Sequence, residues 1–330
     1  MIKLSIALQT NKRLDQYAEL AQIIEGYGFD TLTVYEDLMF QPAWQPLHVM
    51  AQCTNRIRLG PSIVNPYLRH PAIIAGEFAL LNEAAAGRAY LGLGRGAFLE
   101  ALQLTQSRPI TTVRETAEIV QRLLRGDRTP YQGKVFTATE EAYFRWKPTY
   151  DQASVLIGTW GPKMAALAGE IADEVKIGGC WNPAFISIMR GYIAPGAQAV
   201  GRDPAQVSIV VGAVTVVDED RQAAEALARR EVAMYLPVVI RLDPTLHVDE
   251  DELAAVKTAL KHGDQNAAAN AISLETLRKL ACFGTPEEII RQVQAFAESG
   301  ASRVEFGTPH GADEAAAIRL LGERVLPHFN

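Results

Sequence analysis

The segment YLGLGRGAFLEAL, residues 90–102, decides between two folds. Its Gly92, Gly94 and Ala97 satisfy the G-x-G-x-x-G/A pattern of a dinucleotide-binding turn. Glu115 lies near the distance at which such domains place a carboxylate for the ribose of a nicotinamide cofactor. A dinucleotide-binding turn normally follows the first strand of its domain, so the place of this segment in the chain tests the interpretation.

Short apolar strands alternate with amphipathic helices along the whole chain, and the segment belongs to the fourth of eight predicted strands. Such a repeat predicts an α/β fold, a closed (β/α)8 TIM barrel, rather than a Rossmann domain. The glycines then form a tight loop at the C-terminal end of a barrel strand, where barrel active sites lie. The strands are predicted at 2–8, 30–35, 57–64, 88–94, 154–159, 173–179, 207–217 and 302–307.

The repeat is interrupted twice but covers the chain, which predicts a single domain over 1–330. A mostly helical insertion at about 237–283 follows the seventh strand, and an irregular excursion occupies 127–153. We expect both segments to cover the pocket. Such segments vary most between barrels of one architecture, so the sequence does not identify the substrate beyond a small molecule.

The composition excludes several classes of partner. A net charge of −6 argues against nucleic acid and anionic membrane surfaces, and no apolar run approaches the ~20 residues of a membrane span. Cys53, Cys180 and Cys282 show no C-x-x-C spacing, which predicts free, mostly buried thiols in a reducing cytoplasm. His247 and His262 have no neighbouring ligands, so we expect no metal site.

The loops after the second and third strands carry candidate acid/base groups. Glu36 and Asp37 leave the second strand as adjacent carboxylates, and a helix cap or a solvated loop is the alternative interpretation. The stretch LGPSIVNPYLRHP, 59–71, predicts a rigid backbone that presents peptide groups. His70 is a third acid/base candidate, and capping the helix that Pro71 begins is an equal alternative.

The loop after the fifth strand, GTWGPKM at 158–164, predicts a phosphate site. Its glycines permit a tight turn, Pro162 suits the first helical position, and Lys163 stands where a lysine opposes the helix dipole. Free amides, a positive helix end and a lysine together favour an anion. An ordinary capped helix with an exposed lysine is the alternative, and Trp160 either covers a ring system or packs.

Five segments together resemble the bacterial luciferase-like superfamily of flavin- and deazaflavin-dependent enzymes. They are GFDTLTVYED (28–37), LGPSIVNPYLRHPA (59–72), GRAYLGLGRG (87–96), GPKMAALAGEIAD (161–173) and FGTPEEII (283–290). The nearest likeness is to the methylenetetrahydromethanopterin reductase branch, which uses coenzyme F420. The resemblance implies a barrel with an insertion after strand 7, a homodimer or homotetramer, and hydride transfer between F420 and a small organic substrate, as in a methylenetetrahydromethanopterin-reductase-like reaction. The alternatives are a two-component monooxygenase using flavin mononucleotide (FMN) and a catalytically silent cofactor-binding protein.

The resemblance also implies roles for individual residues. A non-prolyl cis peptide, here Ser62–Ile63 by position, supports the back of the cofactor ring, with Val64 and Asn65 continuing the contact. Asp37 matches the acidic position at the deazaflavin head. The cofactor side chain is assigned to Gly94, Arg95 and Gly96, and its phosphate to Gly158, Thr159, Trp160, Gly161, Pro162, Lys163 and Met164.

The chain departs from the family pattern at two positions. Leu38 stands where many relatives have histidine, and Ala7 stands where the pterin-reducing branch has a carboxylate in its first strand. The second departure bears on the pterin substrate and leaves the F420 interpretation intact. Gln9, close to Ala7, can hydrogen-bond but cannot deliver a proton as an acid.

Overall fold

Eight parallel strands form the barrel in the computed structural model, which describes residues 1–329. Their order is β3-β2-β1-β11-β9-β8-β7-β4, and the bridges Leu59–Ala89 and Val64–Leu93 bring β3 against β4 to close the wall. The predicted barrel is therefore confirmed. The strands are β1 (Lys3–Leu8), β2 (Thr31–Tyr35), β3 (Arg58–Ser62), β4 (Tyr90–Leu93), β7 (Ser154–Gly158), β8 (Glu174–Gly178), β9 (Ser208–Val217) and β11 (Arg303–His310).

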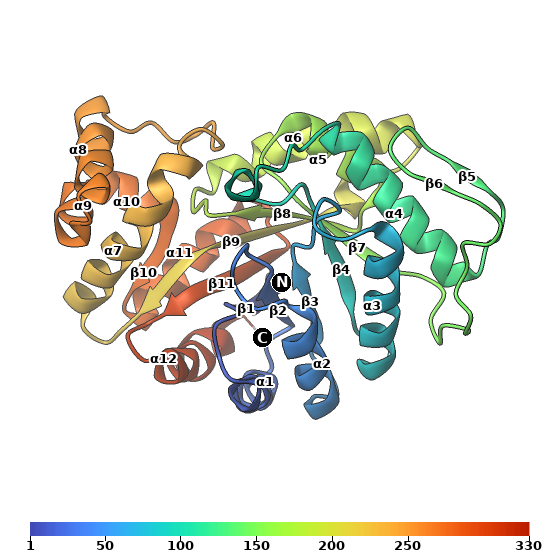
Figure 1. Ribbon diagram of the computed structural model, residues 1–330. Helices are drawn as coiled ribbons and strands as arrows, with labels where there is room; N and C mark the ends of the chain where they lie inside the picture. Colours follow the sequence, from blue (N-terminus) through green and yellow to red (C-terminus); the bar gives the residue numbers. More distant parts are fainter. Residues whose placement is uncertain (330) are drawn as a thin grey trace.

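Helices surround the strands and bury an apolar core between the two layers (Figure 1). Strands buried on both faces need near-continuous apolar runs, and β1 supplies one with Leu4, Ile6 and Leu8 all buried. The outer helices are α1 (Leu14–Tyr27), α2 (Trp44–Cys53), α3 (Pro71–Ala84), α4 (Pro109–Arg125), α5 (Pro162–Ile171), α6 (Ala184–Ala199), α11 (Pro286–Glu298) and α12 (Glu314–Leu320). The chain also contains four short helical turns: η1 (Leu99–Leu102), η2 (Pro204–Gln206), η3 (Leu321–Val325) and η4 (Leu326–His328).

The insertion after the seventh barrel strand has a small hydrophobic core of its own. It comprises α7 (Arg221–Val239), α8 (Glu250–Lys261), α9 (Gln265–Ala271), α10 (Leu274–Leu280) and β10 (Ala281–Gly284). It therefore begins at residue 221 and not at the predicted 237, because α7 packs into the core of the insertion. Each of the four helices begins at an Asp or Ser whose side chain accepts a backbone N–H, and these caps explain where the helices begin. β10 is absent from the sequence prediction, and it pairs with residues 214–217 of the ten-residue β9.

The excursion at 127–153 lies along the outside of α3 and α4, so the expectation that it covers the pocket is wrong. Its hairpin, β5 (Tyr131–Gln132) with β6 (Thr137–Ala138), lies at the opposite end of the molecule from α8–α10 (Figure 1). Glu115 of α4 is buried and accepts the backbone N–H groups of residues 134–136 at 2.6–2.9 Å. The carboxylate therefore fastens the hairpin, and its interpretation as a ribose ligand is also wrong.

The three cysteines are free, as predicted, and only Cys53 is partly exposed. Among residues 1–329, no helix is both long and apolar enough to cross a membrane.

Candidate functional site at the barrel mouth

The glycines of the opening segment make room for the end of β3, namely the Pro61 carbonyl and the Ile63 side chain. A Cβ on Gly92 would overlap the carbonyl oxygen of Pro61, and a Cβ on Gly94 would overlap Ile63 Cδ1. On β7, the next strand beyond β4 in the wall, a Cβ on Gly158 would come within 3.1 Å of the same isoleucine. The G-x-G pattern thus lets β4 and β7 approach the end of β3, and it serves strand packing instead of a dinucleotide.

The end of β3 has the backbone that the resemblance implies. The Ser62–Ile63 peptide is cis. Beyond it, Val64 donates its N–H to Gly92 at 3.0 Å and accepts the N–H of Gly94 at 3.2 Å. The buried Asn65 accepts the backbone N–H groups of residues 67 and 68, both at 3.1 Å. Residues 62–65 therefore form an ordered shelf at the C-terminal end of the barrel.

The two carboxylates after β2 have different surroundings. Glu36 pairs with Arg69 and accepts the Ala43 N–H at 2.6 Å, so it joins the loops after β2 and β3. Asp37 Oδ2 accepts the Gln9 side-chain amide at 2.8 Å, while its Oδ1 has no hydrogen-bond partner within the described chain. Of the two, Asp37 is the one with an oxygen left to accept a ligand N–H.

α7 brings Tyr235 close to Asp37. Burial and the charge of Asp37 both raise the pKa of this half-exposed tyrosine. Tyr35, at the end of β2, has its pKa raised by burial and by the nearby Glu305 and Asp37 carboxylates. The mouth therefore combines one free carboxylate oxygen with neutral phenols, which donate hydrogen bonds without carrying charge.

His70 occupies the cap of α3. Its Nδ1 accepts the Ala72 N–H at 3.2 Å, Pro71 takes the first helical position, and its ring meets Phe136 edge-on at 5.4 Å. The capping alternative is confirmed. The side chain is exposed and its Nε2 is the only ring nitrogen outside this contact, so an acid/base role for His70 stays a prediction.

The 158–164 turn presents the start of α5 to the mouth. Thr159 Oγ1 accepts the Gly161 N–H at 3.1 Å, and the Trp160 indole donates to the Gly178 carbonyl at 2.6 Å. Pro162 begins the helix as predicted, and no side chain caps it. Lys163 is exposed and, within residues 1–329, forms no hydrogen bond or ion pair. An uncapped helix start beside an unpaired ammonium favours an anion.

The loop after β4 lies beside the shelf. Gly96 has φ +77°, and a Cβ there would come within 2.8 Å of the Asn65 side chain. Gln106 donates to the carbonyls of both Arg95 and Gly96, at 2.7 and 3.0 Å, which fixes the loop. Arg95 is exposed at the edge of the mouth, and its guanidinium has no partner in the described part of the chain.

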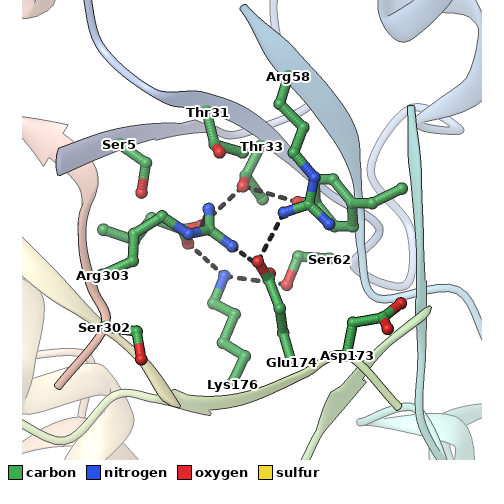
Figure 2. Close-up of polar contacts among 12 residues, drawn as sticks. Ser5, Thr31, Thr33, Arg58, Ser62, Asp173, Glu174, Lys176, Ser302 and Arg303 are labelled. Atoms are coloured by element: carbon green, nitrogen blue, oxygen red, sulfur yellow. Dashed lines mark hydrogen bonds and ion pairs between the residues drawn. The ribbon is translucent and has the colours of Figure 1, made fainter. Parts of the chain in front are cut away.

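Beneath the shelf, the barrel interior holds a network of charges (Figure 2). Lys176 of β8 pairs with Glu305 of β11 and donates to Ser62 Oγ at 2.9 Å. Glu174 accepts from Arg58 at 2.7 Å and from Arg303 at 2.6 Å, and Arg303 lies 3.9 Å from Glu305. The hydroxyl of Thr33 donates to Glu305 at 2.6 Å and meets the Tyr90 hydroxyl at 2.8 Å.

Sequence reasoning missed this network. Its signal is the presence of charged residues inside otherwise apolar strands, as in DEVKIGG (173–179) and SRVEFG (302–307). Lysine and glutamate are almost never fully buried unless they are paired. A lysine and a glutamate in two strands of one barrel therefore predict an ion pair with each other, provided that both side chains face inward.

The network predicts an acid dependence of stability. Burial alone would raise the pKa of Glu174, but the charges of Arg303 and Arg58 outweigh it and hold this pKa below its usual range. A lowered pKa stabilises the fold above the unfolded value of about 4.3, and this contribution is lost as the pH falls through the folded value. We expect Glu174→Gln to cost about 2 kcal/mol at pH 7.

Urea unfolding of the wild type and Glu174→Gln between pH 7 and pH 3 measures this effect. The difference between the two proteins should be constant near neutrality and shrink below about pH 4. A difference that did not change with pH would contradict a charged Glu174.

Comparisons with known proteins find relatives that are similar along almost the whole chain. The sequence profile described as luciferase-like monooxygenase matches residues 1–303. The chain is 31% identical to a 5,10-methylenetetrahydromethanopterin reductase of Archaeoglobus fulgidus, over 95% of each chain. It is 25% identical to an F420-dependent glucose-6-phosphate dehydrogenase of Nakamurella multipartita, over 95% of this chain and 92% of the relative. The structure superposes on the coenzyme F420-dependent tetrahydromethanopterin reductase of Methanopyrus kandleri with a TM-score of 0.92 and 25% identity, covering 100% of this chain and 99% of the other.

Proposed function

Because the chain belongs to the luciferase-like monooxygenase family, we propose that it is an oxidoreductase that uses coenzyme F420 at the barrel mouth just described. The observation that carries the proposal is the pairing of an uncapped, lysine-bearing helix start with a free carboxylate oxygen at Asp37 on the same mouth. Relatives named as F420-dependent, similar over at least nine-tenths of the chain, support the choice of cofactor.

The residues present fit a deazaflavin with a phosphate and an acidic tail. The amides at the start of α5 and the Lys163 ammonium suit the phosphate, because both provide positive charge without a protein partner. Gly161 leaves open space where a Cβ would stand, so an anion can approach the backbone. Arg95, exposed on the neighbouring loop, suits the acidic tail.

The ring end of the site is formed by Asp37 and by the shelf at 62–65. A carboxylate accepts hydrogen bonds, so the free Oδ1 of Asp37 suits an N–H at the ring head. Gln9 holds the other oxygen of Asp37 and thereby orients the carboxylate. The shelf, with Ile63 packed on three glycines, would support one face of the ring and leave the other face for the substrate.

Bound there, F420 would supply the hydride-transferring carbon, and the protein would orient the substrate and manage a proton. Asp37 is the best-placed acid/base candidate, because Glu36 is engaged by Arg69 and by the Ala43 amide. The buried Ala7 places a methyl group where the resemblance expects a carboxylate. A pterin substrate would therefore need another acidic partner. The homodimer or homotetramer stays a prediction.

The proposal predicts tight F420 binding that depends on Lys163. Titration of the purified protein with F420, followed by tryptophan fluorescence and by calorimetry, should show saturable binding that is tighter than FMN binding. Lys163→Ala should weaken F420 binding about tenfold or more, because one charge-assisted contact to a phosphate contributes about 1.5–3 kcal/mol.

Lys257→Ala provides the matched control, because Lys257 is also exposed but lies on α8 in the insertion. This control should bind F420 as the wild type does. Preferential binding of FMN would instead support a two-component monooxygenase, and oxygen uptake with reduced FMN would become the assay. If neither cofactor bound, the proposal would fail.

A further inference from the structure

The ammonium of Lys176 makes three contacts with other side chains of the protein. It pairs with Glu305, donates to Ser62 Oγ at 2.9 Å, and lies 4.9 Å from the centre of the Tyr35 ring. Lys176 is 5% exposed and Glu305 is fully buried, so the pair is almost completely shielded from solvent. Glu305 and Ser62 therefore each accept a hydrogen bond from the ammonium, which ties it to the protein interior.

Together with Glu305 on β11, these contacts join four strands of the barrel. Lys176 belongs to β8, while Ser62 ends β3 and Tyr35 ends β2. Ser62 begins the shelf at 62–65, and Tyr35 stands two residues before Asp37. Figure 2 shows the lysine reaching across the interior to Ser62. One side chain from β8 therefore contacts the segments that carry both halves of the proposed ring site.

Stability alone does not account for a charge in this place. Burial lowers the pKa of Lys176 although the Glu305 carboxylate opposes the change, because removing the ammonium from water is costly. Replacing a buried ion pair by apolar side chains of similar volume is often neutral or stabilising. A geometric role, holding Ser62 at a fixed height, explains the pair better than a net gain in folding energy.

We propose that Lys176 is a positioning residue that acts through the Ser62 hydroxyl to set the shelf on which the cofactor ring rests. The inference rests on the proposed function, because it assigns the shelf to the ring of F420. Glu305 keeps the ammonium in place, and the Thr33 hydroxyl orients Glu305 through the 2.6 Å hydrogen bond. Ser62 then connects this internal network to the mouth.

The test is a double-mutant cycle on F420 affinity, using the full-length protein and the same titration. Ser62→Ala and Lys176→Met should each weaken F420 binding about tenfold, and the double variant should also be weaker by about tenfold rather than a hundredfold. Ser62→Thr keeps the hydroxyl and should restore wild-type affinity within about twofold. Thermal unfolding of every variant separates loss of affinity from loss of stability.

Arg58→Met is the matched control. It breaks the pair with Glu174 in the same network but removes no contact to Ser62. The control should lower the unfolding temperature and keep the F420 affinity within about twofold. If Lys176→Met does not fold, Ser62→Ala and Ser62→Thr still decide, because the Lys176–Glu305 pair is intact in both.

The outcomes separate the two proposals. If the wild type bound F420, and Ser62→Ala or Lys176→Met bound it with unchanged affinity, only the positioning role would be overturned. A hundredfold loss in the double variant would overturn it as well, because the two residues would then act independently. Failure of the wild type to bind F420 would overturn the proposed function together with this inference.

Discussion

Replacing Glu305 by glutamine should lower the free energy of unfolding by about 3–5 kcal/mol, the range for removing one partner of a buried ion pair. The substitution conserves shape but leaves the Lys176 ammonium without a counter-charge in the barrel interior. The second contact of Glu305, from Thr33 Oγ1, survives because a glutamine oxygen also accepts a hydrogen bond. Urea unfolding followed by tryptophan fluorescence measures the change.

Glu219→Gln is the matched control for charge. Glu219 pairs with Arg324 at 3.0 Å, but its side chain is 60% exposed, so solvent screens the pair. This control should change stability by less than about 1 kcal/mol. Equal effects of the two substitutions would mean that burial of the Lys176–Glu305 pair has no energetic consequence.

Gly92→Ala should destabilise the fold by about 3 kcal/mol, the upper part of the range for an overpacked core. The added methyl would overlap the carbonyl oxygen of Pro61 and come within 3.4 Å of Ile63 Cγ2. Backbone atoms cannot rotate away as a flexible side chain can, and the ladder between β3 and β4 fixes both strands here. The shelf at 62–65 would shift, so F420 binding should weaken as well.

Gly191→Ala should change the stability of the fold in the opposite direction and raise it. Gly191 is exposed on α6, and a Cβ there meets no atom within 4 Å. Alanine in a helix interior is favoured over glycine by about 1 kcal/mol, so this variant should be more stable than the wild type. A stable, F420-binding Gly92→Ala protein would refute the packing role assigned to the opening segment.

Much of the fold could be predicted because its signals are local. Strand–helix alternation identifies the eight barrel strands, and Pro162 and Pro286 mark helix starts that the structure reproduces. The sequence does not predict β10, because ACFG, 281–284, is four residues long and stands between two helices. Its partner on β9 lies nearly seventy positions earlier, at 214–217, and no local pattern reports that pairing.

The site could be predicted only where one loop carries it. The turn at 158–164, to which we assign the phosphate, is such a loop, and the cis Ser62–Ile63 peptide followed from the family resemblance. The Lys176–Glu305 pair joins residues 129 positions apart, and closure of the barrel brings them together. The role of the G-x-G glycines depended on Ile63 from another strand, so the motif alone suggested the wrong ligand.

The ten residues of β9 have a consequence for how such an enzyme changes its substrate. β9 pairs with β8 along residues 208–212 and with β11 along residues 210–216. Its last four residues also pair with β10, where the insertion returns. The insertion therefore leaves and rejoins the wall at one place, and it carries its own hydrophobic cluster. We expect exchange of this module to replace Tyr235 beside Asp37. The strand that precedes Asp37 and the strands that carry Ser62 and Gly158 should keep their registers. On the proposed function, we expect exchange of this module to change substrate choice more than cofactor binding.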